Sequence, residues 1–135
     1  MGILIIDRQH GEKSPGSFDG GCQAIVAGRR IIETDLTTAY GRTIEKAVAA
    51  AGHRVVWIDS GYYYNRHREA NAIARKSKSQ KVLYLALHVN AGGGTYALSM
   101  YDAKSKGGKA AAGVLAASMA GLDGISKSKT VGCET

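Results

Sequence analysis

The chain has 135 residues, 44% of them hydrophobic, and a formal net charge of +7 with a pI of about 9.5. This length and apolar fraction fit one folded domain with its own core and exclude an intrinsically disordered chain. Its two cysteines, Cys22 and Cys133, show no C-x-x-C spacing. We therefore expect free thiols, without disulfide staples or a cysteine zinc site.

The sequence contains no apolar run of the roughly 18 residues that would span a bilayer. The apolar N-terminal stretch is short and has no basic segment before it, so we expect no signal peptide. We expect synthesis in the cytoplasm and no membrane insertion. The positive charge favours polyanionic partners such as an anionic cell wall, or serves solubility alone. No nucleic-acid-binding motif accompanies it, so nucleic acid is not an expected partner.

The first half of the chain begins with a strand candidate and a long loop. Residues 2–7 are a short apolar run that predicts a buried strand. Residues 11–30 are rich in Gly, Ser, Pro and Asp without periodicity, which predicts a loop containing a minor strand at 24–27. Loops of this length are uncommon in compact domains and often functional. Residues 33–51 have helical periodicity, with Thr34 and Asp35 expected to cap the first turn and Gly52 to end the helix.

The second half continues the alternation of strands and helices. A strand is predicted at 53–59, a helix at 65–78, a strand from Val82 to His88, a strand at 96–101 and a helix at 105–120. The last 15 residues have few apolar anchors and are expected to be loosely held. This order predicts an α/β fold: a single domain over residues 1–135, with a mostly parallel twisted sheet and helices on both faces.

Two of the predicted strands end on histidines. His10 follows the first strand and His88 closes the strand that begins at Val82. The carboxyl ends of parallel strands share one edge of a sheet, so the two imidazoles are expected to lie near each other. Glu33, at the start of the first helix, is the candidate third ligand. Each residue alone has an ordinary interpretation, such as a helix-dipole partner or a hydrogen-bonded histidine. Together they form the ligand set of catalytic zinc sites that hydrolyse amides.

Four segments resemble the zinc-dependent N-acetylmuramoyl-L-alanine amidases of the amidase type 3 family. Residues 5–11 resemble the Asp-x-Gly-His-Gly opening motif, and Glu33 with its helix resembles the ligand-bearing helix. Residues 66–71 fit the Arg-x-x-x-Ala-Asn signature, and Arg66 is expected to orient the loop after the second strand through an ion pair. Residues 87–91 fit the Ser-x-His-x-Asn-Ala signature, with Leu87 and Ala86 near where the serine usually stands. The resemblance implies zinc bound by His10, Glu33 and His88. It also implies cleavage of the amide between N-acetylmuramic acid and L-alanine in peptidoglycan.

The sequence departs from this family at four points. Gln9 replaces the usual glycine before the first histidine, and Glu12 replaces a frequent second glycine after it. The interval from His10 to Glu33 is longer than is common. The family's catalytic glutamate, which follows a further strand near the C-terminus, has no clear counterpart. Either the chain is a fragment, or it is a shortened member that uses another base. Glu134 and Glu12 are weak candidates, so the catalytic base is unknown.

The resemblance predicts a cell-wall lytic enzyme of the endolysin or autolysin type that acts on peptidoglycan. Three consecutive tyrosines, Tyr62 to Tyr64, form either a sugar-stacking surface or a sheet edge. Two alternatives stay open: another zinc hydrolase on the same scaffold, or a non-catalytic wall-binding or structural component of a phage or other assembly. A diffuse basic face is expected to bind anionic cell-wall polymers; it comprises Lys76, Lys78, Lys81, Lys104, Lys106, Lys109, Lys127 and Lys129.

Overall fold

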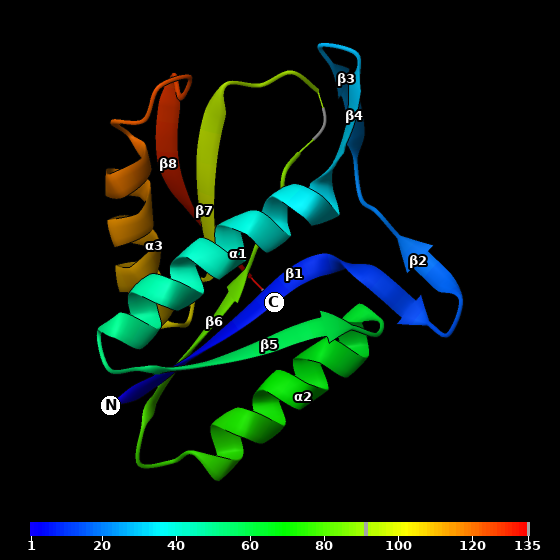
Figure 1. Ribbon diagram of the computed structural model, residues 1–135. Helices are drawn as coiled ribbons and strands as arrows, with labels where there is room; N and C mark the ends of the chain where they lie inside the picture. The colour runs from blue at the N-terminus through cyan, green and yellow to red at the C-terminus, as the bar shows by residue number, and fades with distance from the viewer. Residues whose placement is uncertain (91, 135) are drawn as a thin grey trace. The chain divides into compact units, whose positions relative to one another are not determined.

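The computed structural model describes residues 1–90 and 92–134 (Figure 1). The chain divides into two compact units, Met1–Ala91 and Gly92–Thr135. Its described residues form three helices and a set of mixed and parallel sheets, which confirms the α/β class. No described helix combines the length and the apolar character needed to cross a membrane. The assignment of residues 1–135 to a single domain stays a prediction.

The first unit is built around the long strand β1 (Gly2–Ser14). β5 (Arg54–Ser60) and β6 (Lys81–Ala86) both pair with β1 in parallel, and β2 (Ser17–Asp19) pairs with its far end in antiparallel orientation. The apolar run at the start of β1 is buried on both faces, as expected for the central strand of a parallel sheet. This arrangement brings the carboxyl ends of β1, β5 and β6 to one edge.

The two helices of the first unit contact strand side chains that point to opposite faces of the sheet. Ile5 of β1 and Ile58 of β5 form a buried cluster with Ala70 of α2 (Tyr63–Lys76). Trp57, which alternates with Ile58 and so faces the other way, meets Gly41 of α1 (Glu33–Ala50). A Cβ at Gly41 would lie 2.3 Å from the indole ring, so this close approach of α1 requires glycine.

The second unit is a β-α-β arrangement. β7 (Tyr96–Asp102) and β8 (Lys127–Cys133) pair in parallel and are joined through α3 (Lys106–Met119). The Ser105 hydroxyl accepts a hydrogen bond from the Gly108 amide at 2.9 Å and caps the start of α3. β8 occupies part of the segment expected to be loosely held, so that expectation is wrong. Pairing with β7 stabilises a lysine- and serine-rich segment whose own pattern is weak.

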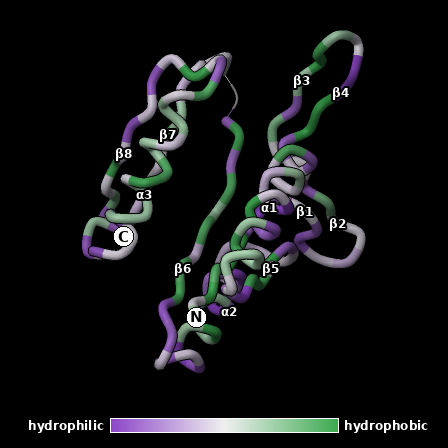
Figure 2. Tube along the Cα trace, turned by 60° about the vertical axis from the view of Figure 1, so that its left-hand side comes forward, coloured by the Kyte–Doolittle hydropathy of each residue, from purple (hydrophilic) through white to green (hydrophobic). Residues whose placement is uncertain are grey.

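The expectation of a long loop at 11–30 is also wrong in part. β1 continues to Ser14, and β3 (Gln23–Val26) and β4 (Arg29–Ile32) form a hairpin that runs directly into α1. Ala27 and Gly28 at its tip have φ of 49° and 75°, which corresponds to a two-residue turn of type I′. Alanine rarely adopts a positive φ, so no turn was predicted at this position. Figure 2 shows hydrophobic residues within this hairpin, where Ile25 and Val26 are exposed.

The described strands do not all join one sheet. The described strands form one mixed four-stranded sheet, the β3–β4 hairpin and the parallel β7–β8 pair. The remaining predicted helices and strands are present with small shifts at their ends. One shift matters for the site: β6 ends at Ala86, so His88 lies beyond the strand rather than at its last position.

Candidate metal centre

His10 is carried by a bulge in β1. Asp7 pairs with Ile58 of β5, but Glu12 already pairs with Ser60, so β1 has several extra residues between these two points. A bulge of this kind bends the strand and redirects its side chains. Gln9 has a φ of 66°, in the left-handed region that favours glycine. This is the position at which the amidase family usually has glycine.

Arg66 holds the bulge in place from within the unit. Its side chain is fully buried, and its Nη1 lies 2.7 Å from Oδ1 of the equally buried Asp7. The same guanidinium donates to the carbonyls of Gln9, His10 (3.3 Å) and Gly61 (2.7 Å). A bent strand leaves carbonyls without ladder partners, and Arg66 satisfies several of them at once. Arg66 thus forms an ion pair, but with Asp7 of β1, and the pair orients the segment that carries His10. It reaches the loop after β5 through its hydrogen bond to the Gly61 carbonyl.

Asp7 also fixes the strained residue of the bulge. Its carboxylate accepts hydrogen bonds from the Gln9 backbone amide at 2.6 Å and from Gln9 Nε2 at 3.1 Å. The Tyr84 hydroxyl donates to Asp7 Oδ2, the oxygen that also accepts from Gln9 Nε2. Burial, and then the hydrogen bond to Asp7, raise the pKa of Tyr84, so its hydroxyl remains a donor. These bonds offset the roughly 1–2 kcal/mol that a left-handed non-glycine residue costs.

Glu33 enters the site at the first turn of α1. Its backbone amide donates to the Cys22 carbonyl at 2.8 Å, and the Thr34 amide donates to the Gly20 carbonyl at 3.1 Å. No side chain caps this helix, so the expected capping by Thr34 and Asp35 is wrong. Backbone carbonyls of the loop before the hairpin take that role. The loop and the start of α1 are thereby joined at Glu33.

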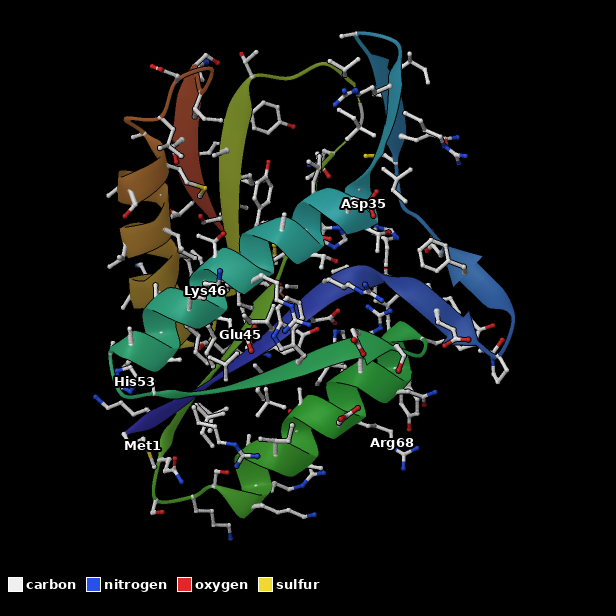
Figure 3. The ribbon with its side chains drawn as sticks, in the orientation of Figure 1. Met1, Asp35, Glu45, Lys46, His53 and Arg68 are labelled. Atoms are coloured by element: carbon white, nitrogen blue, oxygen red, sulfur yellow. The ribbon has the colours of Figure 1, made fainter. Side chains whose placement is uncertain are left out.

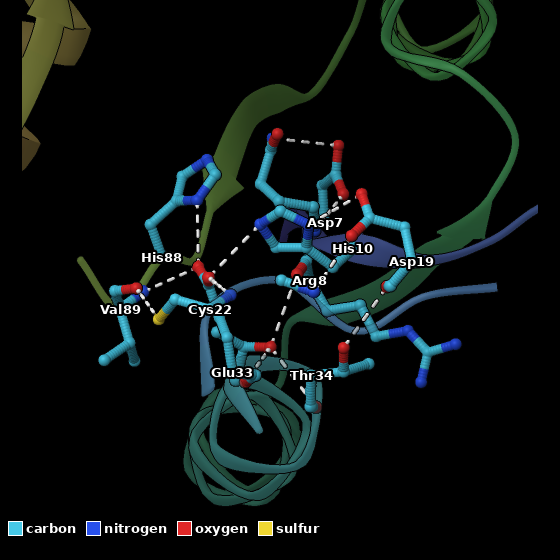
Figure 4. Close-up of polar contacts among 12 residues, drawn as sticks. Asp7, Arg8, His10, Asp19, Cys22, Glu33, Thr34, His88 and Val89 are labelled. Atoms are coloured by element: carbon cyan, nitrogen blue, oxygen red, sulfur yellow. Dashed lines mark hydrogen bonds and ion pairs between the residues drawn. The ribbon is translucent and has the colours of Figure 1, made fainter. Parts of the chain in front are cut away.

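The structure brings His10, Glu33 and His88 together. Their candidate ligand atoms all lie within 4.8 Å of one another. His10 Nε2 is 3.3 Å from Glu33 Oε2, and His88 Nδ1 is 3.1 Å from Glu33 Oε1 (Figure 4). The two imidazole rings meet edge to face with centroids 5.6 Å apart. The three residues singled out by sequence thus converge on one carboxylate.

The Glu33 carboxylate is held by two backbone amides. Cys22 N donates to Oε2 at 3.0 Å and Val89 N donates to Oε1 at 2.8 Å. Burial raises the pKa of Glu33, but these amides together with His88 outweigh burial, and the pKa is lowered. The buried side chain is therefore a carboxylate. The Cys22 thiol also donates to the Val89 carbonyl at 2.9 Å, which ties the segment beside His88 to the base of the hairpin.

Asp19 orients His10 from the side opposite Glu33. Its Oδ2 lies 3.0 Å from His10 Nδ1, and its Oδ1 accepts the Gly21 amide at 2.9 Å. The hydrogen bond from His10, then the Gly21 amide and Lys13, lower the pKa of Asp19 to about 2. A carboxylate behind the imidazole is the usual outer partner of a metal-binding histidine. With Nδ1 donating to Asp19, Nε2 presents a lone pair to Glu33.

The contact between His10 and Glu33 can hold either a proton or a metal ion. Two acceptors 3.3 Å apart repel unless a proton or a metal ion lies between them. The donor set of two imidazoles and one carboxylate suits zinc. Ligand atoms bound to zinc at about 2 Å in a tetrahedron lie roughly 3.3 Å apart. Each histidine lies at about that distance from Glu33, but His10 contacts Oε2 and His88 contacts Oε1. His88 is 45% exposed whereas Glu33 is 4% exposed, so solvent reaches the site from the His88 side.

Gly21 leaves the space that this convergence needs. A Cβ at Gly21 would lie 2.5 Å from Glu33 Oε2 and 2.8 Å from His10 Cδ2, and its φ is 73°. Any larger residue would push the two ligand side chains apart. Glycine is thus required here for both its conformation and its size.

The other sequence candidates lie outside the trio. Glu12 is exposed, and its backbone carbonyl accepts the Gly61 amide. Glu134 is exposed and follows β8 in the second unit. Sequence reasoning missed Asp19 as the outer partner of His10. Its only signal was its place in a glycine-rich segment, where an aspartate normally indicates a turn.

Comparison of the chain with protein-family models, curated proteins and solved structures finds no match. The amidase resemblance therefore depends on the four motifs, and the candidate metal centre depends on the contacts among its side chains.

Proposed function

We propose that the chain is a zinc-dependent peptidoglycan amidase that hydrolyses the N-acetylmuramoyl–L-alanine amide bond. The observation that carries the proposal is the convergence of His10 and His88 on the buried Glu33 carboxylate. The four family-like motifs supply the choice of substrate. A zinc ion bound there supplies an electrophile for the amide carbonyl and lowers the pKa of a water to about 7.

The residues of the chain divide the remaining work. His10, Glu33 and His88 bind the metal, and Asp19 fixes the ring orientation of His10. Arg66 holds the bulge that carries His10. The exposed side of the site, at His88, admits the substrate. The proposal includes the finer fold, a mostly parallel twisted sheet with helices on both faces, and action on the cell wall after synthesis in the cytoplasm.

A purified full-length chain tests this proposal. We expect about one zinc per chain by elemental analysis, and free L-alanine amino termini without new reducing sugars when peptidoglycan is digested and examined by mass spectrometry. Glu33→Gln should abolish both. Glu45→Gln is the matched control, because Glu45 lies on the same helix, is more exposed than Glu33, and forms an ion pair with Arg42 away from the trio. Absence of zinc after supplementation would overturn the proposal.

The catalytic base is tested separately. Glu134→Gln and Glu12→Gln leave the three proposed ligands intact, so zinc content should not change. Substitution of the true base should lower turnover by roughly 10²–10⁴-fold. If neither variant loses activity, both candidates are excluded.

A second candidate function is a non-catalytic wall-binding or structural component. The observation that favours it is that the only carboxylate in the described metal group, Glu33, serves as a ligand and not as a base. Binding of the chain to peptidoglycan without hydrolysis would support this function. Wall binding through the basic residues should weaken as salt is raised, because exposed charges are screened.

A further inference from the structure

We propose that Tyr62, Tyr63 and Tyr64 form a glycan-stacking platform beside the candidate metal centre. The platform would bind the N-acetylated sugar chain of the substrate by its ring faces. The choice of sugar as ligand depends on the proposed function, whereas the position of the platform depends only on contacts within the first unit.

The three tyrosines lie at the same edge of the sheet as the bulge. Glu12 of β1 pairs with Ser60 of β5, and the Gly61 amide donates to the Glu12 carbonyl at 2.8 Å. Tyr62 directly follows this contact as the residue before α2, and Tyr63 and Tyr64 open the helix. The turn after β5 thus places the three tyrosines next to the C-terminal end of β1.

All three rings are accessible. Tyr62, Tyr63 and Tyr64 are 57%, 46% and 71% exposed, and none belongs to the buried cluster beneath α2. Three adjacent tyrosines on the surface contribute little to the core, although each presents a large apolar face with a polar tip. Such side chains are typical of binding surfaces, because two rotatable bonds carry a large contact area.

Lys13 connects the platform with the metal centre. Its Nζ lies 4.9 Å from the centroid of the Tyr63 ring and 3.4 Å from Asp19 Oδ2. Asp19 in turn contacts His10 Nδ1. One ammonium group therefore touches both a tyrosine ring and the residue that orients a proposed ligand. A substrate seated on Tyr63 would lie close to the metal centre.

The chemistry of the rings fits a sugar. Lys13 and Arg68 each lie over one face, of Tyr63 and Tyr64 respectively, which shows that the electron-rich rings attract positive groups. A sugar would stack on a ring face that no cation covers, or would displace the cation. The polarised C–H bonds of a pyranose present a positive edge to such a face, and the tyrosine hydroxyls can hydrogen-bond to sugar hydroxyl and acetamido groups. Figure 3 shows Arg68 on the outward side of α2. Nucleobases would also stack on tyrosine, but the position beside a centre proposed to cut a glycan-linked amide favours sugar.

The test uses a soluble β-1,4-linked N-acetylglucosamine tetrasaccharide, which has no stem peptide and no scissile amide. We expect the full-length chain to bind it with or without zinc, as measured by calorimetry. Tyr62→Ala/Tyr64→Ala and Tyr63→Ala should weaken binding about tenfold or more, the scale of one lost stacking contact. Tyr→Phe substitutions should retain most of the affinity. Tyr40→Ala is the matched control, because Tyr40 is 53% exposed on α1 and lies outside the platform.

Zinc content and circular dichroism of each variant show whether the fold is intact. Three results would overturn the proposal: no binding of the tetrasaccharide, equal binding by the platform variants and by Tyr40→Ala, or displacement by a single-stranded oligonucleotide that binds the tyrosines more tightly than the sugar does. The tetrasaccharide is not cleaved by an amidase, so failure here is distinct from failure of the proposed function. If the chain binds the sugar but has no amidase activity, the platform is supported and only the proposed reaction is contradicted.

Discussion

The two histidines of the candidate metal centre are supported in different ways. His10 lies in a bulge that the buried Arg66 and Asp7 hold from behind, and Asp19 contacts its second nitrogen. His88 follows the end of β6, is 45% exposed, and among the described residues its side-chain hydrogen bond is the one to Glu33. One imidazole is therefore fixed before a metal binds, whereas the other lies at the open side.

His10 is thus the ligand held in position, and His88 lies where substrate can reach the site. A site with every ligand buried and doubly supported would exclude substrate, as closed structural zinc sites do. A site with every ligand exposed would lose rotamer freedom on metal binding and bind more weakly. The first unit combines one preorganised histidine, a carboxylate fixed by two amides and one accessible histidine. The following predictions test whether that division is real.

Arg66 should have the largest effect on the supported side. Arg66→Met leaves the buried Asp7 carboxylate unpaired, and breaking a buried ion pair typically costs about 3–5 kcal/mol. We expect a loss of that order in the free energy of unfolding, measured with urea, together with weaker zinc binding. Arg68→Met, an exposed arginine on the same helix, should change stability by less than about 1 kcal/mol. Equal effects of the two substitutions would contradict the role of Arg66.

The two ligand histidines should differ in their effect on the metal-free protein. His10→Ala and His88→Ala each remove a proposed ligand, so both should lower zinc affinity by more than the roughly 100-fold that an outer partner supplies. His10→Ala should lower metal-free stability more than His88→Ala, because His10 contacts both Asp19 and Glu33, whereas the half-exposed His88 contacts Glu33 alone among the described residues. Competition with a chelator gives the affinity, and urea unfolding gives the stability. A larger stability loss for His88→Ala would reverse the comparison.

Asp19 should tune the metal centre without abolishing it. Asp19→Asn keeps the shape but weakens the hold on His10, and loss of an outer partner usually lowers metal affinity about 10–100-fold. The same carboxylate gives a pH signature. Because folding lowers its pKa from 3.8 to about 2, its stabilising contribution is complete above the unfolded value and disappears as the pH falls toward 2. The Asn variant should therefore lose less stability than the parent between pH 5 and 2, as followed by urea unfolding at each pH; an identical pH dependence would contradict this.

Gln9 should show the smallest effect. Gln9→Gly relieves the left-handed backbone but loses the side-chain contact with Asp7, so the free energy of unfolding should change by no more than about 1 kcal/mol. Gln9→Ala loses the same contact and keeps the strain. The glycine variant should therefore be the more stable of the two by roughly 1 kcal/mol. If the alanine variant is as stable, the bulge is not strained at this residue.

The sequence predicted the residues of the candidate site better than the structure that supports them. His10, Glu33 and His88 were recognisable because two strand ends and a helix start are marked by local patterns. The bulge was not, because it depends on the pairing register between β1 and β5, and no local pattern encodes that register. Asp19 resembled an ordinary turn residue, and the amides of Cys22 and Val89 have no sequence signal at all. β8 was missed because its stability comes from pairing with β7.

The β3–β4 hairpin starts and ends on the metal centre. Cys22 and Glu33, at its two feet, are joined by hydrogen bonds in both directions, while its tip at Ala27 and Gly28 is an isolated turn. The feet fix Glu33 without help from the tip. The turn is therefore a natural graft point, at which foreign peptides or binding loops can be inserted to redirect the protein to new surfaces while the cation-binding side chains keep their geometry.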